Sequence, residues 1–144
     1  MTALRFLALD SDTVQALRHG APDANGQTPE RQASDGGGNP CRHCLHDIAE
    51  GAPMLVLAHR PFPAPQPYAE LGPIFLHAED CPRYGGDAGV PAMILRRQAI
   101  LLRGYGTDDR IVYGTGKVIP PKDIEAAAAH LFARPEIAYV HLRS

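Results

Sequence analysis

The stretch NPCRHCLH, residues 39–46, carries two cysteines two residues apart between two histidines, and a glycine run at 36–38 precedes it. A third cysteine, Cys81, stands four residues after His77, so the whole pattern reads C-x2-C-x32-H-x3-C. Zinc in structural sites takes four sulfur or nitrogen ligands in a tetrahedron. The spacing therefore predicts a Cys3His zinc site made by Cys41, Cys44, His77 and Cys81, with zinc as the cofactor.

Other interpretations of the three cysteines stay open at this point. Cys41 and Cys44 are also spaced like a thioredoxin-type redox pair, although that motif normally follows a strand and opens a helix. Three unrelated buried cysteines are a plainer alternative, because free cysteine is often a core residue. His43 and His46 are more often solvated or hydrogen-bonded than ligands, but if His43 displaced His77 or Cys81, the fourth position could open to water and the site would become catalytic.

An enzymatic interpretation uses the same residues. PCRHC (40–44) and HAE (77–79) match the two halves of the zinc deaminase signature, but in reversed order, and Cys81 would close the position that a reactive water needs. The alternative function is therefore a zinc-dependent hydrolase or deaminase-like enzyme. Its general base would be Glu79, with Glu70 as the second candidate.

The composition limits the function classes. The 144 residues, 44% of them hydrophobic, suit one domain, 1–144. A formal charge of −2 argues against nucleic acid held by bulk electrostatics, although residues 94–144 hold eight basic residues against five acids. No apolar run is long enough for a membrane span, and the N-terminus lacks a signal-peptide pattern. We expect a cytoplasmic protein, where paired cysteines more often bind metal than form disulfides.

Apolar runs predict strands at 4–9, 54–59, 72–77, 93–106, 109–119 and 137–143. A short helix is expected between Asp10 and Gly20, with Val14 and Leu17 inward. A second helix is expected over 121–134, with Ile124, Ala127, Ala128, Leu131 and Phe132 on its apolar face. The predicted fold is α+β, with a mixed or antiparallel sheet of about six strands, two helices and a treble-clef-like or zinc-ribbon-like metal site.

The chain should be organised around the cysteines. Residues 21–40 contain no large apolar side chain and are expected to be a mobile loop. A zinc-binding lobe is expected over 40–84, and a sheet with its helix over 93–144. The proline-rich connection at 59–73 could dock into a partner's aromatic groove, but a rigid covering loop is the simpler interpretation.

Longer blocks carry a family resemblance: GNPCRHCL, HRPF, PYAELGPIFLHAEDCPRY, LLRGYGTDDRIVYGTGKVI and AYVHLRS. From Cys41 onward the chain resembles the bacterial family of small proteins called domain of unknown function family 1203. That resemblance implies no activity. It marks as pattern positions Cys41, His43, Cys44, Pro61, Phe62, Tyr68, Glu70, Gly72, Pro73, His77, Cys81, Arg103, Arg110, Tyr113 and Arg143. Similar members usually continue for about ten more residues through a last strand containing Asn and Cys, which could contribute either a ligand or an edge strand.

Polar residues near the ends of predicted strands suggest a second site. Guanidinium groups bind carboxylate or phosphate through two parallel hydrogen bonds. We expect a small anionic ligand or an acidic peptide as the partner, and neither nucleic acid nor a membrane; the sequence does not give an oligomeric state. The candidate ligand-binding residues are Arg103, Arg110, Tyr113, His141 and Arg143, with Tyr105 nearby.

Overall fold

A computed structural model of the chain describes residues 4–143 and contains two three-stranded sheets. The predicted α+β class is confirmed, but the prediction of one sheet of about six strands is wrong, because the six strands are divided equally. Two compact units hold the two sheets. We call Phe6–Pro61 with Glu70–Ala88 the cysteine unit, and Phe62–Ala69 with residues 4–5 and 89–143 the C-terminal unit. That the chain folds as one domain stays a prediction.

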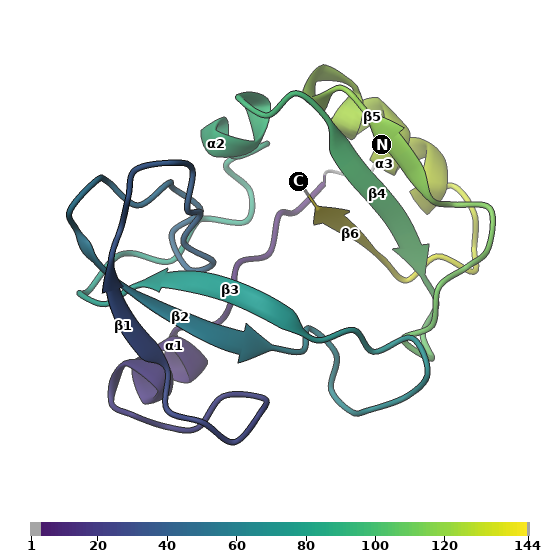
Figure 1. The fold of residues 1–144 in the computed structure, drawn as a ribbon. Coiled ribbons are helices and arrows are strands. Elements are labelled where there is room, and N and C mark those ends of the chain that lie inside the picture. The colour runs from purple at the N-terminus through teal and green to yellow at the C-terminus, as the bar shows by residue number, and fades with distance from the viewer. Residues whose placement is uncertain (1–3, 144) are drawn as a thin grey trace. The chain divides into compact units, whose positions relative to one another are not determined.

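The sheet of the cysteine unit is antiparallel, in the order β1 (Glu30–Ala33), β2 (Pro53–His59) and β3 (Gly72–His77) (Figure 1). Its two longer strands match the predictions at 54–59 and 72–77. Leu55 pairs with Leu76, and Leu57 with Ile74, so these four buried side chains share one face. This face is the apolar surface on which the rest of the unit packs.

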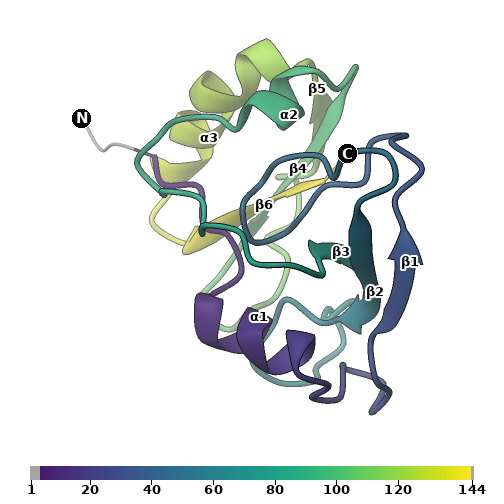
Figure 2. The same ribbon diagram turned by 90° about the vertical axis from the view of Figure 1, so that its left-hand side faces the viewer.

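Helix α1 (Ser11–Arg18) has Asp10 as its N-cap residue, whose carboxylate accepts a hydrogen bond of 3.0 Å from the Thr13 backbone N–H. Val14 and Leu17 are buried in the same core cluster as the leucines of β2 and β3. The helix lies beside this sheet (Figure 2). The short predicted helix is therefore confirmed, with its expected inward residues.

Two sequence-based predictions for this unit are wrong. Residues 4–9 form no strand: Phe6 N–H donates to the Gly86 carbonyl and Leu9 N–H to that of Arg42, but no ladder develops. Conversely, β1 lies inside the segment 21–40 that was expected to be a loop. All four of its residues are exposed, so it has no apolar pattern, and its ladder with β2 holds it in place.

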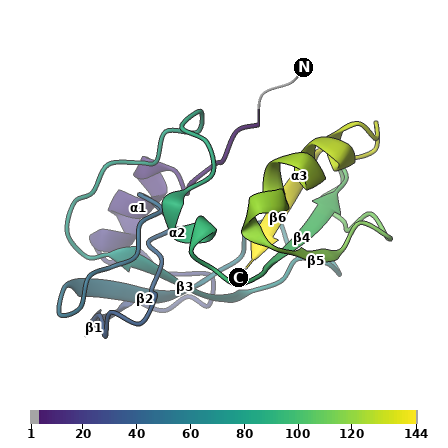
Figure 3. The ribbon, with the colours of Figure 1, turned by 90° about the horizontal axis from the view of Figure 1, so that it is seen from above.

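The sheet of the C-terminal unit is antiparallel too, in the order β5 (Lys117–Ile119), β4 (Ile100–Tyr105) and β6 (Tyr139–Arg143). Helix α3 (Ile124–Phe132) follows a 3-10 turn, η1 (Pro121–Asp123), and covers one face of this sheet (Figure 3). The core between them contains Ile100, Leu102 and Ile119 from the strands and Ile124, Ala128 and Leu131 from the helix.

The elements of this unit are shorter than the sequence predicts. Residues 93–106 divide into a helical turn, α2 (Ala92–Leu95), and β4, while only Lys117–Ile119 of 109–119 is a strand. The Thr115 hydroxyl donates to the Val112 carbonyl at 2.6 Å and accepts from Gly104 N–H at 3.0 Å, which holds the intervening segment as a turn. Phe132, expected inward, is 41% exposed. None of the helices in residues 4–143 is long and apolar enough to cross a membrane.

Candidate metal centre

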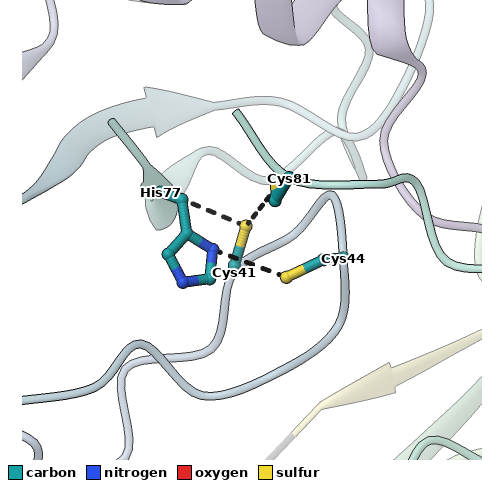
Figure 4. A group of neighbouring side chains, drawn as sticks. All are labelled: Cys41, Cys44, His77 and Cys81. Carbon is teal, nitrogen blue, oxygen red and sulfur yellow. Dashed lines mark hydrogen bonds between the residues drawn. The ribbon is translucent and has the colours of Figure 1, made fainter. Parts of the chain in front are cut away.

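Four side chains from separate parts of the cysteine unit converge on one point (Figure 4). Cys41 and Cys44 lie in the turn before β2, His77 is the last residue of β3, and Cys81 follows four residues later. Their ligand atoms all lie within 4.8 Å of one another. The cluster predicted from spacing is therefore assembled, and it could hold a metal ion.

Two of the distances in the cluster are close to those between the ligands of a tetrahedral ion. Zn–S bonds of about 2.3 Å and Zn–N bonds of about 2.0 Å place two sulfurs about 3.8 Å apart, and a sulfur and a nitrogen about 3.5 Å apart. Cys41 Sγ and Cys81 Sγ are separated by 3.9 Å, and Cys44 Sγ and His77 Nδ1 by 3.4 Å. All three cysteines are free, so no disulfide competes for the sulfurs.

The backbone around Cys41 explains how the turn forms. Leu45 N–H donates to the Cys41 carbonyl at 2.9 Å, and Cys41 N–H donates to the His46 carbonyl at 3.0 Å, which closes a tight loop. Leu45 adopts a positive φ of 55°, a conformation that suits glycine better than leucine. The turn thereby aims two sulfurs at one point, as the x2 spacing requires.

Backbone contacts fasten this turn to the end of β3. Arg42 N–H donates to the Phe75 carbonyl at 3.0 Å, and His77 N–H donates to Cys41 Sγ at 3.3 Å. The pair His77 and Cys81 lies on a strand end and the bend after it. No helix begins within residues 78–91, so the treble-clef prediction gains no support.

An outer layer of polar groups surrounds Cys81, and it comes largely from α1. Arg18 donates from Nη2 to Cys81 Sγ and from Nε to the His77 carbonyl, both at 3.0 Å. His43 Nδ1 lies 3.2 Å from Cys81 Sγ, while its Nε2 lies 2.9 Å from the Ser11 hydroxyl. A guanidinium group therefore lies against a sulfur that would carry negative charge when it binds a metal.

Electrostatics separate the three thiols. Hydrogen bonds from the Cys44 side chain and from nearby backbone N–H groups lower the pKa of Cys41 to about 3, against the opposing effect of burial. The shared hydrogen bond with Cys41 and burial raise the pKa of Cys44. Burial and the charge of Cys41 raise the pKa of Cys81. Without a metal, Cys41 is thus the favoured thiolate, and a bound cation would displace the protons of Cys44 and Cys81.

The remaining histidines and acids of the predicted site lie around the four donors. His43 contacts Cys81 as described, and burial, followed by the nearby Arg18 charge, lowers its pKa. His46 Nδ1 lies 2.8 Å from the Cys44 carbonyl, so this ring is oriented by the backbone. Glu79 is exposed, on the bend between the two later ligands, and Glu70 is partly buried at the start of the second segment of the unit.

The structure brings together three of the five predicted ligand-binding residues. Arg103 pairs with His141, and Leu101 pairs with Arg143, so the Arg103, His141 and Arg143 side chains share one face of the C-terminal sheet. The pair Tyr105 and Tyr139 lies on this face too, with stacked rings 5.3 Å apart. We call these residues the arginine face.

Arg110 and Tyr113 do not lie on the arginine face. The guanidinium carbon of Arg110 is 5.9 Å from the centre of the Tyr68 ring, and the Tyr113 and Tyr68 hydroxyls share a hydrogen bond. Gln66, from the same proline-rich connection, donates to the Asp109 carbonyl at 2.7 Å. These two predicted residues therefore belong to a separate cluster that fastens the connection to the loop after β4.

Sequence reasoning missed Arg18 and Ser11 as neighbours of the metal cluster. Arg18 and Ser11 lie far from Cys81 and His43 along the sequence. The prediction of α1 rests only on its buried apolar residues. One signal was present: Arg18 follows the buried Leu17 in the last turn of a capped helix, where a cation is common for helix reasons alone. Because the helix end alone explains a cation at this position, the sequence gives no separate sign that Arg18 contacts Cys81.

Fold and site together define an α+β protein with a Cys3His cluster arranged as a possible metal site. The sequence profile of the family described as Protein of unknown function (DUF1203) matches residues 38–144, so the chain belongs to this family. All four cluster residues lie within the matched region, whereas Ser11 and Arg18 precede it. Comparison with curated proteins gives no match, and neither does comparison with solved structures.

Proposed function

We propose that this protein binds one zinc ion through Cys41, Cys44, His77 and Cys81, and that the ion has a structural role. The proposal rests on the convergence of the four donor atoms, which all lie within 4.8 Å of one another. Sulfur-rich donor sets select zinc among the common divalent ions. A shell of three thiolates and one imidazole leaves a net charge of −1 on the zinc complex, which the Arg18 guanidinium offsets.

A structural role follows from what the four donors connect. The ion would join the turn at 41–44 to the end of β3 and to the bend that contains Cys81, and the same core contains Val14 and Leu17 of α1. Four protein ligands leave no place for a reactive water, which is the usual arrangement of a structural site. The reducing cytoplasm is the proposed location, since such a site needs reduced thiols.

Metal analysis of protein purified without added zinc tests this proposal. We expect one zinc per chain, and its removal by a chelator should unfold the cysteine unit, because structural zinc contributes about 10 kcal/mol or more in small modules. Cys44→Ser should lose the metal. His46→Ala is the matched control: it changes a neighbour that contacts only the Cys44 carbonyl, and zinc content should be unchanged. Equal metal loss in both variants would contradict the assignment of ligands.

The hydrolase or deaminase-like alternative receives no support from a specific contact in the described residues. The exposed Glu79 makes no hydrogen bond or ion pair within residues 4–143. Glu79→Gln should therefore leave metal content and thermal unfolding unchanged. Only a hydrolytic activity that this variant abolishes would revive the alternative.

A second candidate function is binding of a small carboxylate at the arginine face. The register that aligns Arg103, His141 and Arg143 favours it. A second observation is the Tyr105 hydroxyl, which is fully buried and has no hydrogen-bond partner in residues 4–143. An unsatisfied buried hydroxyl costs about 1–3 kcal/mol, and an acceptor oxygen would remove that cost. We favour a small carboxylate over an acidic peptide, because the alignment of these side chains needs no ligand longer than a single carboxylate group.

Calorimetric titration with benzoate tests this second function. Arg103→Gln and Arg143→Gln should each weaken binding about tenfold, because each removes a charged hydrogen-bond donor. Arg31→Gln is the control, since Arg31 lies on the exposed strand β1 of the other unit. Benzoate binding that survives both sheet variants would remove this candidate.

A further inference from the structure

A groove between β5 and α3 is used by neither proposed site. It has a volume of about 420 Å³, which lies in the range of small-molecule sites. The floor of the groove is apolar and is formed by Leu102, Ile119 and Leu131. On the side of the helix it is lined by the small side chains of Ala126 and Ala127. All of its lining residues belong to the C-terminal unit, and its strand residues Leu102, Lys117 and Ile119 lie on the face of the sheet opposite the arginine face.

Three basic side chains from two elements line this groove: Lys117 of β5, His130 of α3 and Arg134 just after the helix. Lys117 pairs with Leu102, so its side chain lies on the face of the sheet that α3 covers. Lysine is common on edge strands, where its side chain could equally lie on the opposite face. Within residues 4–143 the Lys117 and His130 side chains make no hydrogen bond or ion pair. Arg134 is held by Glu136, with N–O distances of 2.5 and 2.7 Å.

The path of the chain places the basic residues at one end of the groove and an acidic residue toward the other. Helix α3 starts a few residues after β5 ends and turns back along the sheet, so its later turns lie toward the start of β5 (Figure 3). Lys117, His130 and Arg134 therefore gather at one end, while Asp123 lines the groove two helical turns before His130. Seven residues of helix separate that acid from His130, a distance of about 10 Å.

We propose that this groove binds a phosphate monoester of a small apolar or aromatic group. The Lys117 ammonium and the His130 imidazole supply donors from two elements, and Arg134 adds Nη1, the guanidinium nitrogen that Glu136 does not engage. Donors from several directions suit a tetrahedral phosphate better than a planar carboxylate. The apolar body of the ligand lies on the floor formed by Leu102, Ile119 and Leu131. Asp123, toward the opposite end, disfavours a second anionic group there and limits the ligand to one phosphate.

Titration of the zinc-loaded full chain with phenyl phosphate, followed by two-dimensional amide NMR, tests this inference. Saturable shifts should map to residues 114–117 and to α3, and phenol and inorganic phosphate should each bind more weakly than phenyl phosphate. Lys117→Ala should raise the dissociation constant about tenfold, and His130→Gln should raise it in the same direction. Circular dichroism confirms that both variants are folded.

Two matched controls separate this groove from general charge effects and from the arginine face. Lys122 is the only other lysine in the sequence and is exposed in η1, outside the groove, so Lys122→Ala should change the constant by no more than about twofold. Arg103→Gln, on the opposite face of the sheet, should also leave it unchanged. The inference is overturned if phenyl phosphate does not saturate, if Lys117→Ala binds it as wild type does, or if Lys122→Ala weakens it equally.

Discussion

Replacing Arg18 with glutamine removes a guanidinium that contacts a proposed metal ligand. The side chain is only 5% exposed, and it donates to Cys81 Sγ and to the His77 carbonyl at 3.0 Å each. Its third contact, with Asp80 at 3.3 Å, involves a carboxylate that is 89% exposed, so it contributes little. The two buried contacts are therefore responsible for most of the effect.

The expected size of the effect follows from these contacts. A hydrogen bond to a charged group contributes about 1.5–3 kcal/mol, so losing the bond to the Cys81 sulfur should weaken zinc binding about tenfold or more. Loss of a group that orients a metal ligand typically costs 10–100-fold in affinity, which agrees with this range. Arg18→Lys keeps the charge but not the planar fork and should fall between glutamine and wild type.

Competition against a chromophoric chelator measures the zinc affinity, and thermal unfolding of the zinc-loaded protein measures stability. Arg83→Gln is the matched control, because Arg83 donates at 2.6 Å to the Ala8 carbonyl in the same unit and to no proposed ligand. That control should lower stability while leaving zinc affinity unchanged. Zinc bound as tightly by Arg18→Gln as by wild type, or an equal loss of affinity in both variants, would contradict the proposed role of Arg18.

Three further predictions concern single substitutions, two in the cysteine unit and one in the C-terminal unit. Leu45→Gly should retain zinc and raise the thermal midpoint, since φ at this position is 55° and glycine relieves strain of about 1 kcal/mol; a lower midpoint would contradict this. Asp10→Ala should destabilise the cysteine unit by about 1 kcal/mol in denaturant unfolding. Because hydrogen bonds from Thr13 lower the pKa of Asp10 below 3.8, its stabilisation is complete above that pH and is lost as pH falls through the folded-state pKa, so the variant should show a weaker acid dependence. Gly104→Ala should destabilise the C-terminal unit by about 1–3 kcal/mol in the same assay, because a Cβ there would lie 2.6 Å from Ile137 Cδ1; unchanged unfolding would show that the close approach relaxes freely.

The metal cluster could be predicted from the sequence because its information is local and chemical. Cys41 and Cys44 define a turn by their spacing, and Cys81 and His77 complete a donor set that leaves no cysteine over. The strands β2 and β3 were also predictable, since their residues are apolar and buried on one face. No comparable signal marks β1, whose four residues are all exposed and are ordered only by pairing with β2.

The division into two sheets depends on pairings that apolar patterns do not specify. Strand β4 pairs with β6 across more than thirty residues, and the register of that pairing decides that Arg103 faces His141. A shift of one residue would move these side chains to the face covered by α3. For this reason the arginine face was predictable only as a set of candidate residues, of which Arg110 and Tyr113 contact Tyr68 in the structure.

X-ray absorption at the zinc edge, on protein purified without added metal, would examine the four proposed ligands themselves. We expect one zinc per chain, with three sulfur neighbours at about 2.3 Å and one nitrogen neighbour at about 2.0 Å. A spectrum dominated by oxygen and nitrogen neighbours, or protein that carries no metal, would contradict this expectation.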